Sequence, residues 1–304
     1  MTTMRDRFYS VTEELLATDE CAALVLADIG AARVRTALDR YPGRATNVGI
    51  REQAMVGVAA GLAMEGFRPI LHSYAPFLVE RAFEQLKLDL SHQGVGAILA
   101  SVGASYDWAE GGRTHQAPGD VAVLDTLPGW NVHVPGHPDE VEMLLRYEMD
   151  RSGPAYIRLG SQSNARATLT QPGRFVPLRT YDDAVATIVA VGPFLDRTVE
   201  AVRDLRVNVV YAATVRPFDS ETLLRVAGSQ QDVILVEPYL AGTSIREVTE
   251  TRGLSPRVLG LGVPRSEFRR YGNADEHDAA HGLDAAGIRR SVVAFLDERA
   301  PVLS

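Results

Sequence analysis

Short apolar runs alternate with longer helical stretches along the chain, and this alternation restricts the fold more than any other feature. Strands that alternate with helices are typical of parallel sheets covered by helices on both faces. Ser10 and Glu13 have the spacing of a capping box for a first helix, and Gly66 is placed to end a second. In the first half, the pattern predicts strands at 22–27, 69–72, 96–101, 131–134 and 155–159, and helices at 11–18, 51–65, 77–90 and 138–150.

The alternation stops between residues 163 and 183, where Ser, Asn, Thr, Gln, Pro and Gly occur without a sustained period, as is typical of a linker. Beyond it, the pattern predicts strands at 184–191, 207–211, 232–236 and 257–261, and helices that end near 205, begin after 219, and lie near 243–251 and 284–297. We therefore expect an α/β protein with two parallel-sheet domains, at residues 1–162 and 184–304, joined by a linker at 163–183.

Charge and composition argue against several classes of protein. The formal net charge is −8, and the 31 basic residues, of which only Lys87 is a lysine, are scattered without a dense run, so a nucleic-acid partner is not expected. No stretch approaches the roughly 18 apolar residues of a membrane span, and the first residues lack the apolar core of a secretory signal. We expect a cytoplasmic protein with no membrane partner, in which Cys21, next to an apolar run, is a buried small hydrophobe.

Three segments of the first half carry residue types suited to catalysis. Residues 46–55 bring Glu52 into the first turn of an alanine-rich helix, where a solvated acid is common because the helix dipole favours it. Residues 73–85 hold a cluster of Tyr and Phe, which is more often core than a binding platform. Residues 110–116 form a glycine-rich loop with His115, where glycine permits close approach of a ligand, although a lone loop histidine is usually a surface residue.

Taken together, these segments resemble the pyrimidine-binding domain of the transketolase family of thiamine-diphosphate enzymes. The resemblance rests on the order and spacing of Gly49–Glu52, Arg81–Gln85 and Gly112–Gln116. Residues 209–219, 233–239 and 282–289 look like the C-terminal domain of the same family, so that the resemblance extends from about residue 5 to residue 296. It implies that residues 1–162 form the pyrimidine-binding domain and residues 184–304 the C-terminal domain.

The resemblance implies a cofactor, thiamine diphosphate, and a role for several residues. The carboxyl group of Glu52 would hydrogen-bond N1′ of the cofactor pyrimidine, and His115 would face the substrate and help a proton transfer at its hydroxyl or carbonyl oxygen. Two aromatic side chains would flank the aminopyrimidine ring, and Asp28 would lie close to the thiazolium. The implied catalytic residues are Glu52 and His115, and the implied cofactor-binding residues are Asp28, Glu52, Tyr74, Phe77 and Arg81.

The family's Mg-diphosphate motif, Gly-Asp-Gly followed by an Asn pair, is not found, and Gly119-Asp120 is followed by Val-Ala-Val. The chain therefore resembles the C-terminal, β-type subunit of a split enzyme and is predicted to carry no metal site of its own. It would need an N-terminal, diphosphate-binding partner subunit, with which an α2β2 heterotetramer is expected. Mg²⁺ (or Ca²⁺) would be held mainly by that partner.

Three departures from the family pattern concern the substrate. Gly103 and Gly111 stand where the family has a histidine and an aspartate that contact substrate hydroxyls, and Ser161 stands where it has a phosphate-reading arginine. Losing a guanidinium fork removes a bidentate phosphate contact, so the acceptor lacks a phosphate or another residue reads it. The candidates for substrate contact are Arg113, which we favour, Gln116, Arg158 and Ser161, with Arg5 as a further substitute.

One other motif, at residues 276–281, has two histidines one helical turn apart and would suit a metal if it were helical, but we interpret it as a polar loop. The predicted function is a transferase reaction that moves a two-carbon ketol unit from a ketose-like donor to an aldehyde acceptor. Two other enzymes stay open, the β-subunit of a 2-oxo acid dehydrogenase E1 component and a decarboxylating enzyme similar to deoxyxylulose-phosphate synthase. The alternative from another class is a non-catalytic regulatory pairing subunit.

Overall fold

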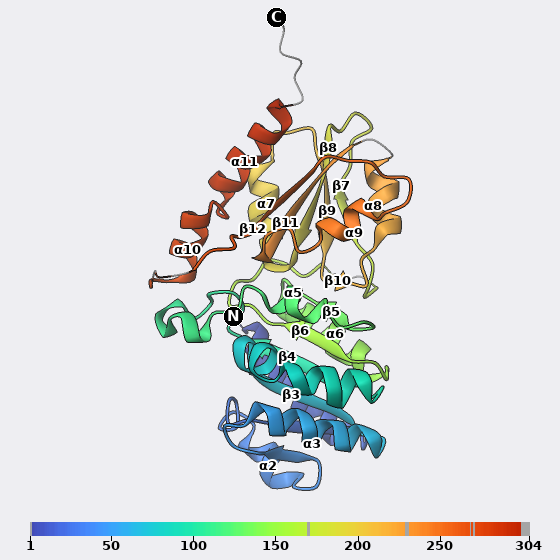
Figure 1. Cartoon of the computed structure of the whole chain (residues 1–304), viewed down its shortest axis with the longest axis vertical. Coiled ribbons are helices and arrows are strands. Elements are labelled where there is room, and N and C mark those ends of the chain that lie inside the picture. Colours follow the sequence, from blue (N-terminus) through green and yellow to red (C-terminus); the bar gives the residue numbers. More distant parts are fainter. Residues whose placement is uncertain (1, 169–170, 229–230, 268, 270, 299–304) are drawn as a thin grey trace, which may run out of the picture.

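The computed structural model describes residues 2–168, 171–228, 231–267, 269 and 271–298. Its first sheet has the strand order β10-β5-β6-β4-β3-β1-β2, and every neighbouring pair is parallel except β10 with β5 (Figure 1). The sheet consists of β1 (Ala22–Leu26), β2 (Ala45–Asn47), β3 (Arg68–Tyr74), β4 (Ile98–Val102), β5 (Asn131–His133), β6 (Ala155–Arg158) and β10 (Thr214–Arg216).

Helices cover both faces of this sheet, because the central strands are buried along their whole length and supply apolar side chains to each face. On one face, α1 and α6 pack against the side chains of Leu24, Ile70 and Ile157, and on the other α3 and η2 pack against Val25, Leu71 and Leu99. The helical segments are α1 (Met4–Thr18), α2 (Arg35–Arg40), α3 (Glu52–Met64), η1 (Pro76–Arg81), α4 (Phe83–Gln85), η2 (Leu86–His92), η3 (Ala109–Gly111), η4 (Arg113–His115), α5 (Asp120–Leu124) and α6 (Pro138–Met149).

The second sheet has the order β12-β11-β8-β9-β7, again parallel except at one edge, where β7 runs antiparallel to β9 (Figure 1). Its strands are β7 (Val176–Arg179), β8 (Ala186–Val191), β9 (Asn208–Ala212), β11 (Asp232–Leu240) and β12 (Val258–Val263). The accompanying helical segments are η5 (Gly192–Phe194), α7 (Leu195–Ala201), α8 (Ser220–Ala227), α9 (Ile245–Thr249), α10 (Ala274–His281) and α11 (Ala285–Asp297). The predicted α/β class with two mainly parallel sheets is confirmed.

The division between the two halves is less simple than the sequence pattern indicates. β7 lies inside the segment expected to be a linker, and β10, from the second half, pairs with β5 of the first sheet. One apolar core also spans both sheets, since it includes Val132 of β5 and the following Val134 together with Val210 of β9. The two domains therefore share buried surface rather than being joined by a linker alone.

Three local predictions were wrong. The first helix begins at Met4 and its capping box is formed by Thr3 and Asp6, not by Ser10 and Glu13. Cys21 is exposed, because it precedes β1 at the surface. Residues 276–281 lie in α10 and not in a loop, because Asn273 and Glu276 cap this helix reciprocally. Within the described part of the chain, no helix is long and apolar enough to cross a membrane.

Candidate active site

Glu52 lies at the first turn of α3 with its carboxyl group turned into the protein, where the residue is 1% exposed. Arg81 Nη1, from η1, donates to Glu52 Oε2 at 2.8 Å, and Ser73 Oγ, from β3, donates to Oε1 over a longer 3.4 Å. The Arg81 side chain is 40% exposed, so the ion pair reaches from the interior to the surface. Glu52 is thus a buried carboxyl group whose Oε1, among the described residues, accepts one long hydrogen bond.

The side-chain amide of Asn47 fixes the loops that follow β1 and β2 and lead to this site. Asn47 Oδ1, at the end of β2, accepts from the backbone N–H of Asp28 at 2.8 Å and from that of Gly49 at 3.1 Å. Both of these residues have positive φ, +73° at Asp28 and +75° at Gly49. A non-glycine residue rarely adopts this conformation, so the backbone at the exposed Asp28 is held in place by the Asn47 contact.

Four rings lie together beyond the carboxyl ends of β3 and β4, in the group formed by Tyr74, Phe77, Trp108 and His115. Tyr74 stacks on Trp108 with ring centroids 5.5 Å apart and an interplanar angle of 29°. His115 packs edge-on against Trp108 at 4.4 Å, Phe77 at 5.0 Å and Tyr74 at 5.4 Å. Arg81 lies over the Phe77 ring at 4.0 Å, which joins the aromatic group to Glu52. Sequence reasoning missed Trp108, although its place in the loop ahead of His115 could have indicated it.

Two glycines make room for these rings. A Cβ atom on Gly103, which follows β4 with φ +72°, would lie 2.4 Å from Tyr74 Cδ1. A Cβ atom on Gly111 would lie 3.1 Å from Trp108 Cδ2 and 3.2 Å from His115 Cγ. A side chain at position 103 would therefore exclude the observed ring packing, and a side chain at position 111 would be crowded by the Trp108 and His115 rings.

Two of the candidate substrate residues, Arg158 and Arg113, already bind other residues of the chain. Arg158 is buried, with Nε donating to Asp120 Oδ2 at 2.8 Å and Nη2 to Ser105 Oγ at 2.7 Å. Arg113 donates to the Gln116 carbonyl at 2.8 Å and pairs with Glu267 at 3.3 Å. The Gln116 side chain is buried, and neither its amide oxygen nor its nitrogen has a hydrogen-bond partner in the described part of the chain.

Ser161 is exposed and bound to Asp107 twice, through its backbone N–H and its hydroxyl, both at 2.8 Å. Burial raises the pKa of Asp107 to about 6, although these two hydrogen bonds oppose the shift by stabilising the charged carboxylate. The backbone N–H and the hydroxyl of Ser161 are therefore both engaged by the carboxyl group of Asp107, the residue directly before Trp108.

A buried histidine lies beneath the strand ends. His72 Nδ1 donates to the Ala100 carbonyl at 2.8 Å, which leaves Nε2 to accept from the Tyr9 hydroxyl at 2.9 Å. Arg5 Nε in turn donates to that hydroxyl at 3.0 Å. Burial lowers the pKa of His72 to about 3, so the ring is neutral. Arg5, named as a substitute phosphate reader, is thus bound to Tyr9.

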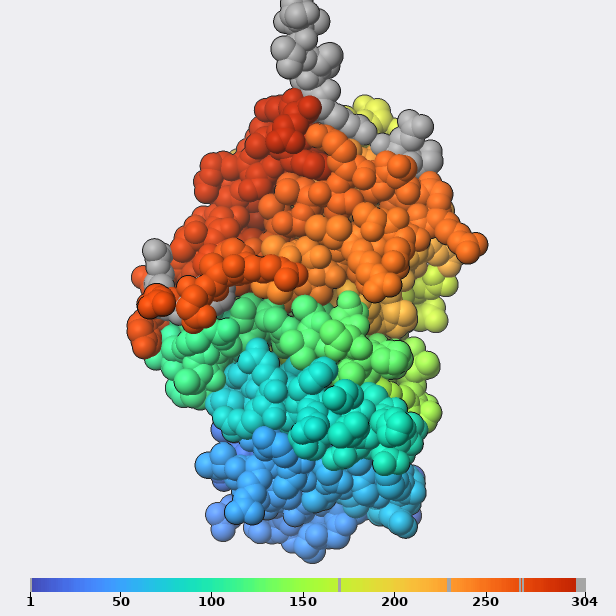
Figure 2. Space-filling view, viewed as in Figure 1, coloured from blue at the N-terminus to red at the C-terminus, as the bar shows by residue number. Residues whose placement is uncertain are grey.

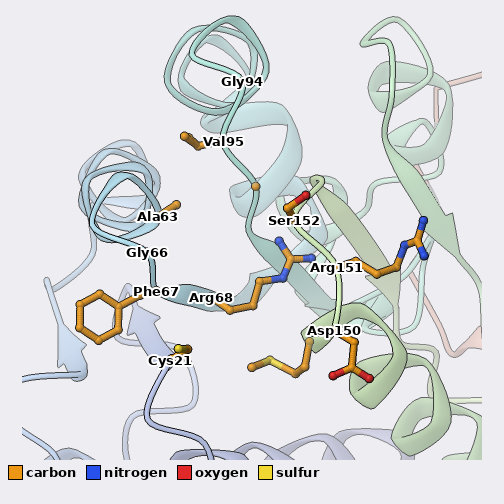
Figure 3. Close-up of a pocket in the computed structure, with 12 residues that line it drawn as sticks. Cys21, Ala63, Gly66, Phe67, Arg68, Gly94, Val95, Asp150, Arg151 and Ser152 are labelled. Atoms are coloured by element: carbon orange, nitrogen blue, oxygen red, sulfur yellow. The ribbon is translucent and has the colours of Figure 1, made fainter.

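A separate cavity of about 510 Å³ opens at the other end of β3, where Cys21, Phe67, Arg68 and Asp150 lie (Figure 3). Arg68 begins β3 and Tyr74 ends it, so the cavity and the aromatic group are about 20 Å apart at roughly 3.3 Å per residue. Arg68 donates to the Glu148 carbonyl at 2.9 Å, and burial lowers its pKa to about 10. None of the residues predicted for the site lines this cavity.

The two histidines of α10, His277 and His281, pack against the ring of Tyr106. His277 stacks on Tyr106 at 4.7 Å, and Tyr106 donates to Asp278, which also accepts from Gln162 and Arg197. Among the residues whose placement is given, no group of three or more His, Cys, Asp and Glu side chains could hold a metal ion.

Comparisons with known proteins agree with this architecture. Residues 1–166 match the family described as transketolase, pyrimidine binding domain. An uncharacterized 33.6 kDa protein from the fasciation locus of Rhodococcoides fascians is 46% identical over 299 residues, which are 97% of this chain and 95% of that protein. The 1-deoxy-D-xylulose-5-phosphate synthase of Polaromonas sp. strain JS666 is 33% identical over 266 residues, which are 84% of this chain and 41% of the synthase.

Solved structures give the same result. A split-gene transketolase described as an inactive β4 tetramer superposes with a TM-score of 0.82 and 26% identity, over 98% of this chain and 99% of that one. Transketolase from Campylobacter jejuni superposes with a TM-score of 0.81 and 17% identity, over 96% of this chain and 46% of that one, which shows a shared fold. The chain thus spans less than half of the synthase and of the Campylobacter enzyme that it matches.

Proposed function

The chain belongs to the transketolase family, and from that premise we propose that it is the C-terminal, β-type subunit of a split thiamine-diphosphate-dependent transferase. The enzyme transfers a two-carbon ketol unit from a ketose-like donor to an aldehyde acceptor, and the chain acts only together with a diphosphate-binding partner subunit. In this reaction the C2–C3 bond of the ketose breaks and a new bond forms to the acceptor's carbonyl carbon. The donor C3 hydroxyl loses a proton and the acceptor oxygen gains one, so no external oxidant is needed.

The observation that carries the proposal is the buried Glu52 carboxylate beside the ring of Phe77. These residues fit the pyrimidine half of the cofactor, because Oε1 of Glu52 has only a long contact with Ser73 and the aromatic side chains offer flat apolar faces. Glu52 would hold the pyrimidine, Phe77 and Tyr74 would flank it, Arg81 would fix the Glu52 carboxylate, and Asp28 would lie beside the thiazolium. When bound, thiamine diphosphate supplies the carbanion chemistry.

His115 would hold or move the proton at the substrate's hydroxyl or carbonyl oxygen. Its Nδ1 lies 2.9 Å from Thr114 Oγ1, and its ring edge meets three aromatic rings, so its orientation is fixed before substrate binds. A general acid–base group held in place in this way contributes roughly 10²–10⁴-fold to a rate. Gln116, Arg113, Arg158 and Ser161 remain proposals for substrate contact, of which the buried, unpartnered Gln116 amide has the most hydrogen-bonding capacity left.

The need for a partner is supported by the surface around Glu52. α3 and η2 lie side by side on the face seen in Figure 2. Several large apolar side chains on these helices and in the loop before α3 are exposed. Exposed apolar groups gathered on neighbouring helices are typical of protein interfaces. We propose that the partner subunit covers this face in an α2β2 assembly and holds Mg²⁺ and the diphosphate. The exposed side chains are Ile50 (72%), Val58 (40%), Met64 (55%) and Leu88 (42%).

The test is Glu52→Gln in the complex of this chain with its diphosphate-binding partner. We expect turnover of hydroxypyruvate with an aldehyde to fall roughly 10²-fold or more, because the carboxyl group is lost, while assembly measured by size-exclusion chromatography is unchanged. Glu65→Gln is the matched control, since Glu65 is exposed at the other end of α3. Wild-type turnover by Glu52→Gln, or equal turnover by the chain without its partner, would contradict the proposal.

A decarboxylating synthase is the second candidate, because the curated relative from Polaromonas is a deoxyxylulose-phosphate synthase at 33% identity. In that case a 2-oxo acid would lose CO2 and its remaining two-carbon unit would join the aldehyde. Pyruvate and a ketose phosphate offered separately as donors distinguish the two, because only the first releases CO2.

A further inference from the structure

We propose that Trp108 selects the acceptor, and that the acceptor is an aldehyde with an aromatic or branched apolar group and no phosphate. This inference rests on the proposed function and names the substrate class of the same site. Three features of the site support it. The ring of Trp108 is partly exposed, a side chain at Gly103 has no space, and three nearby arginines are bound to other residues.

Trp108 extends the aromatic wall that the rings of Tyr74, Phe77 and His115 form. One face of its ring stacks on Tyr74 and its edge meets His115 at 4.4 Å, yet the residue is 41% exposed. The ring is therefore packed against two neighbours yet partly open to solvent, next to the side chain that we assign to the substrate oxygen. An aromatic pair is stabilised beyond the apolar area that it buries, so this ring suits a ligand with a flat apolar group.

A polar side chain at position 103 is incompatible with this aromatic wall. Any Cβ atom on Gly103 would lie 2.4 Å from Tyr74 Cδ1, so a residue able to bind a substrate hydroxyl at that point would displace the ring. Gly111 in turn permits the close approach of Trp108 and His115. The backbone thus favours ring packing over hydroxyl recognition at two places.

Three of the described guanidinium groups near the wall are already paired with carboxylates. Arg158 is buried against Asp120, Arg81 is bound to Glu52, and Arg113 is bound to the Gln116 carbonyl and Glu267. A phosphate binds best to an arginine that offers both nitrogens of its fork. Asp107, directly before Trp108 in the chain, adds a carboxylate that would repel a dianion at the pH where it is charged.

The experiment compares benzaldehyde with glyceraldehyde 3-phosphate as acceptors in the complex with the partner subunit, with hydroxypyruvate as donor. The C1–C2 bond of hydroxypyruvate breaks, CO2 leaves, a C–C bond forms to the aldehyde carbon, and the resulting oxygen takes up a proton. We expect wild-type kcat/KM to be higher for benzaldehyde. Trp108→Ala should lower the ratio of benzaldehyde to phosphate substrate about tenfold, and Trp108→Phe should restore most of it.

A second readout needs no turnover. Trp108 and the buried Trp130 are the two tryptophans of the chain, so Trp130→Phe leaves Trp108 as the single indole reporter. Benzyl alcohol should change its fluorescence at concentrations where glycerol 3-phosphate does not. Loss of all turnover together with no cofactor binding would defeat the proposed function. Turnover with a preference for the phosphorylated acceptor, or an unchanged ratio in Trp108→Ala, would overturn only the assignment of Trp108.

Discussion

Replacing Gly103 by alanine should disrupt the aromatic wall, and the structure separates the two costs of this change. The first is conformational, because φ is +72° and an L-residue with a side chain pays about 1–2 kcal/mol there. The second is steric, because the new Cβ would lie 2.4 Å from Tyr74 Cδ1, and overpacking of this kind costs about 1–3 kcal/mol. The sum is about 2–5 kcal/mol.

Gly129→Ala is the matched control for the conformational cost. Gly129 has φ +79° and nothing lies within 4 Å of an added Cβ, so only the first cost applies. Urea unfolding of both variants should show Gly103→Ala to be the less stable by the steric share, about 1–3 kcal/mol. In a Tyr74→Ala background, that excess should disappear. Equal losses in the two glycine variants, or an excess that persists without the Tyr74 ring, would refute the argument.

Two further changes address the buried charges. Asp120→Asn leaves the Arg158 guanidinium buried without its carboxylate and should cost about 3–5 kcal/mol of unfolding free energy in urea, so a loss below about 1 kcal/mol would contradict the buried ion pair. Burial lowers the pKa of His72 to about 3 from 6.5, so between these pH values the unfolded chain binds a proton that the native chain does not. Stability should therefore decrease as the pH is lowered across that window, by up to about 1.4 kcal/mol per pH unit from this group. His72→Gln should remove this part of the slope and the exposed His92→Gln should not, as measured by urea unfolding at several pH values.

The sequence predicts the buried strands well and the short edge elements poorly. β1, β4 and β8 are apolar on both faces, so their runs are evident without any structure. β7 and β10 are only a few residues long, and each forms an antiparallel edge pair, so neither offers a run or a period to detect. Both depend on tertiary pairing, which sequence pattern does not encode.

Helix ends could have been predicted better from capping chemistry. Asn273 and Glu276 have the capping-box spacing at the start of α10, as do Thr3 and Asp6 at the start of α1. The polar composition of α10 gives no apolar period, whereas its N-cap residue and third residue have the spacing that predicts a helix. The same rule, applied at Ser10, placed a cap inside α1, because a cap signal has meaning only where the backbone is not already helical.

Candidate site residues differ in how far their surroundings could be foreseen. The ion pair of Glu52 with Arg81 joins residues 29 positions apart, so no local pattern contains it. Arg81 is also one turn beyond the Phe77 ring that it covers, and this second contact follows from local geometry. Arg158, by contrast, is set at a strand end, where an arginine can either reach a ligand or be neutralised internally. Asp120 decides this from 38 residues away, through a contact that no local pattern contains.

The internal neutralisation of Arg158 bears directly on substrate choice. A guanidinium that is buried with a carboxylate at 2.8 Å would have to give up that partner to bind a phosphate, and breaking such a pair costs about 3–5 kcal/mol, which would weaken phosphate binding by at least about two orders of magnitude. The Trp108 ring requires no such exchange, since the residue is already 41% exposed and gains from being covered. The balance of these two free energies, rather than the number of arginines near the site, is the physical reason to expect an apolar acceptor.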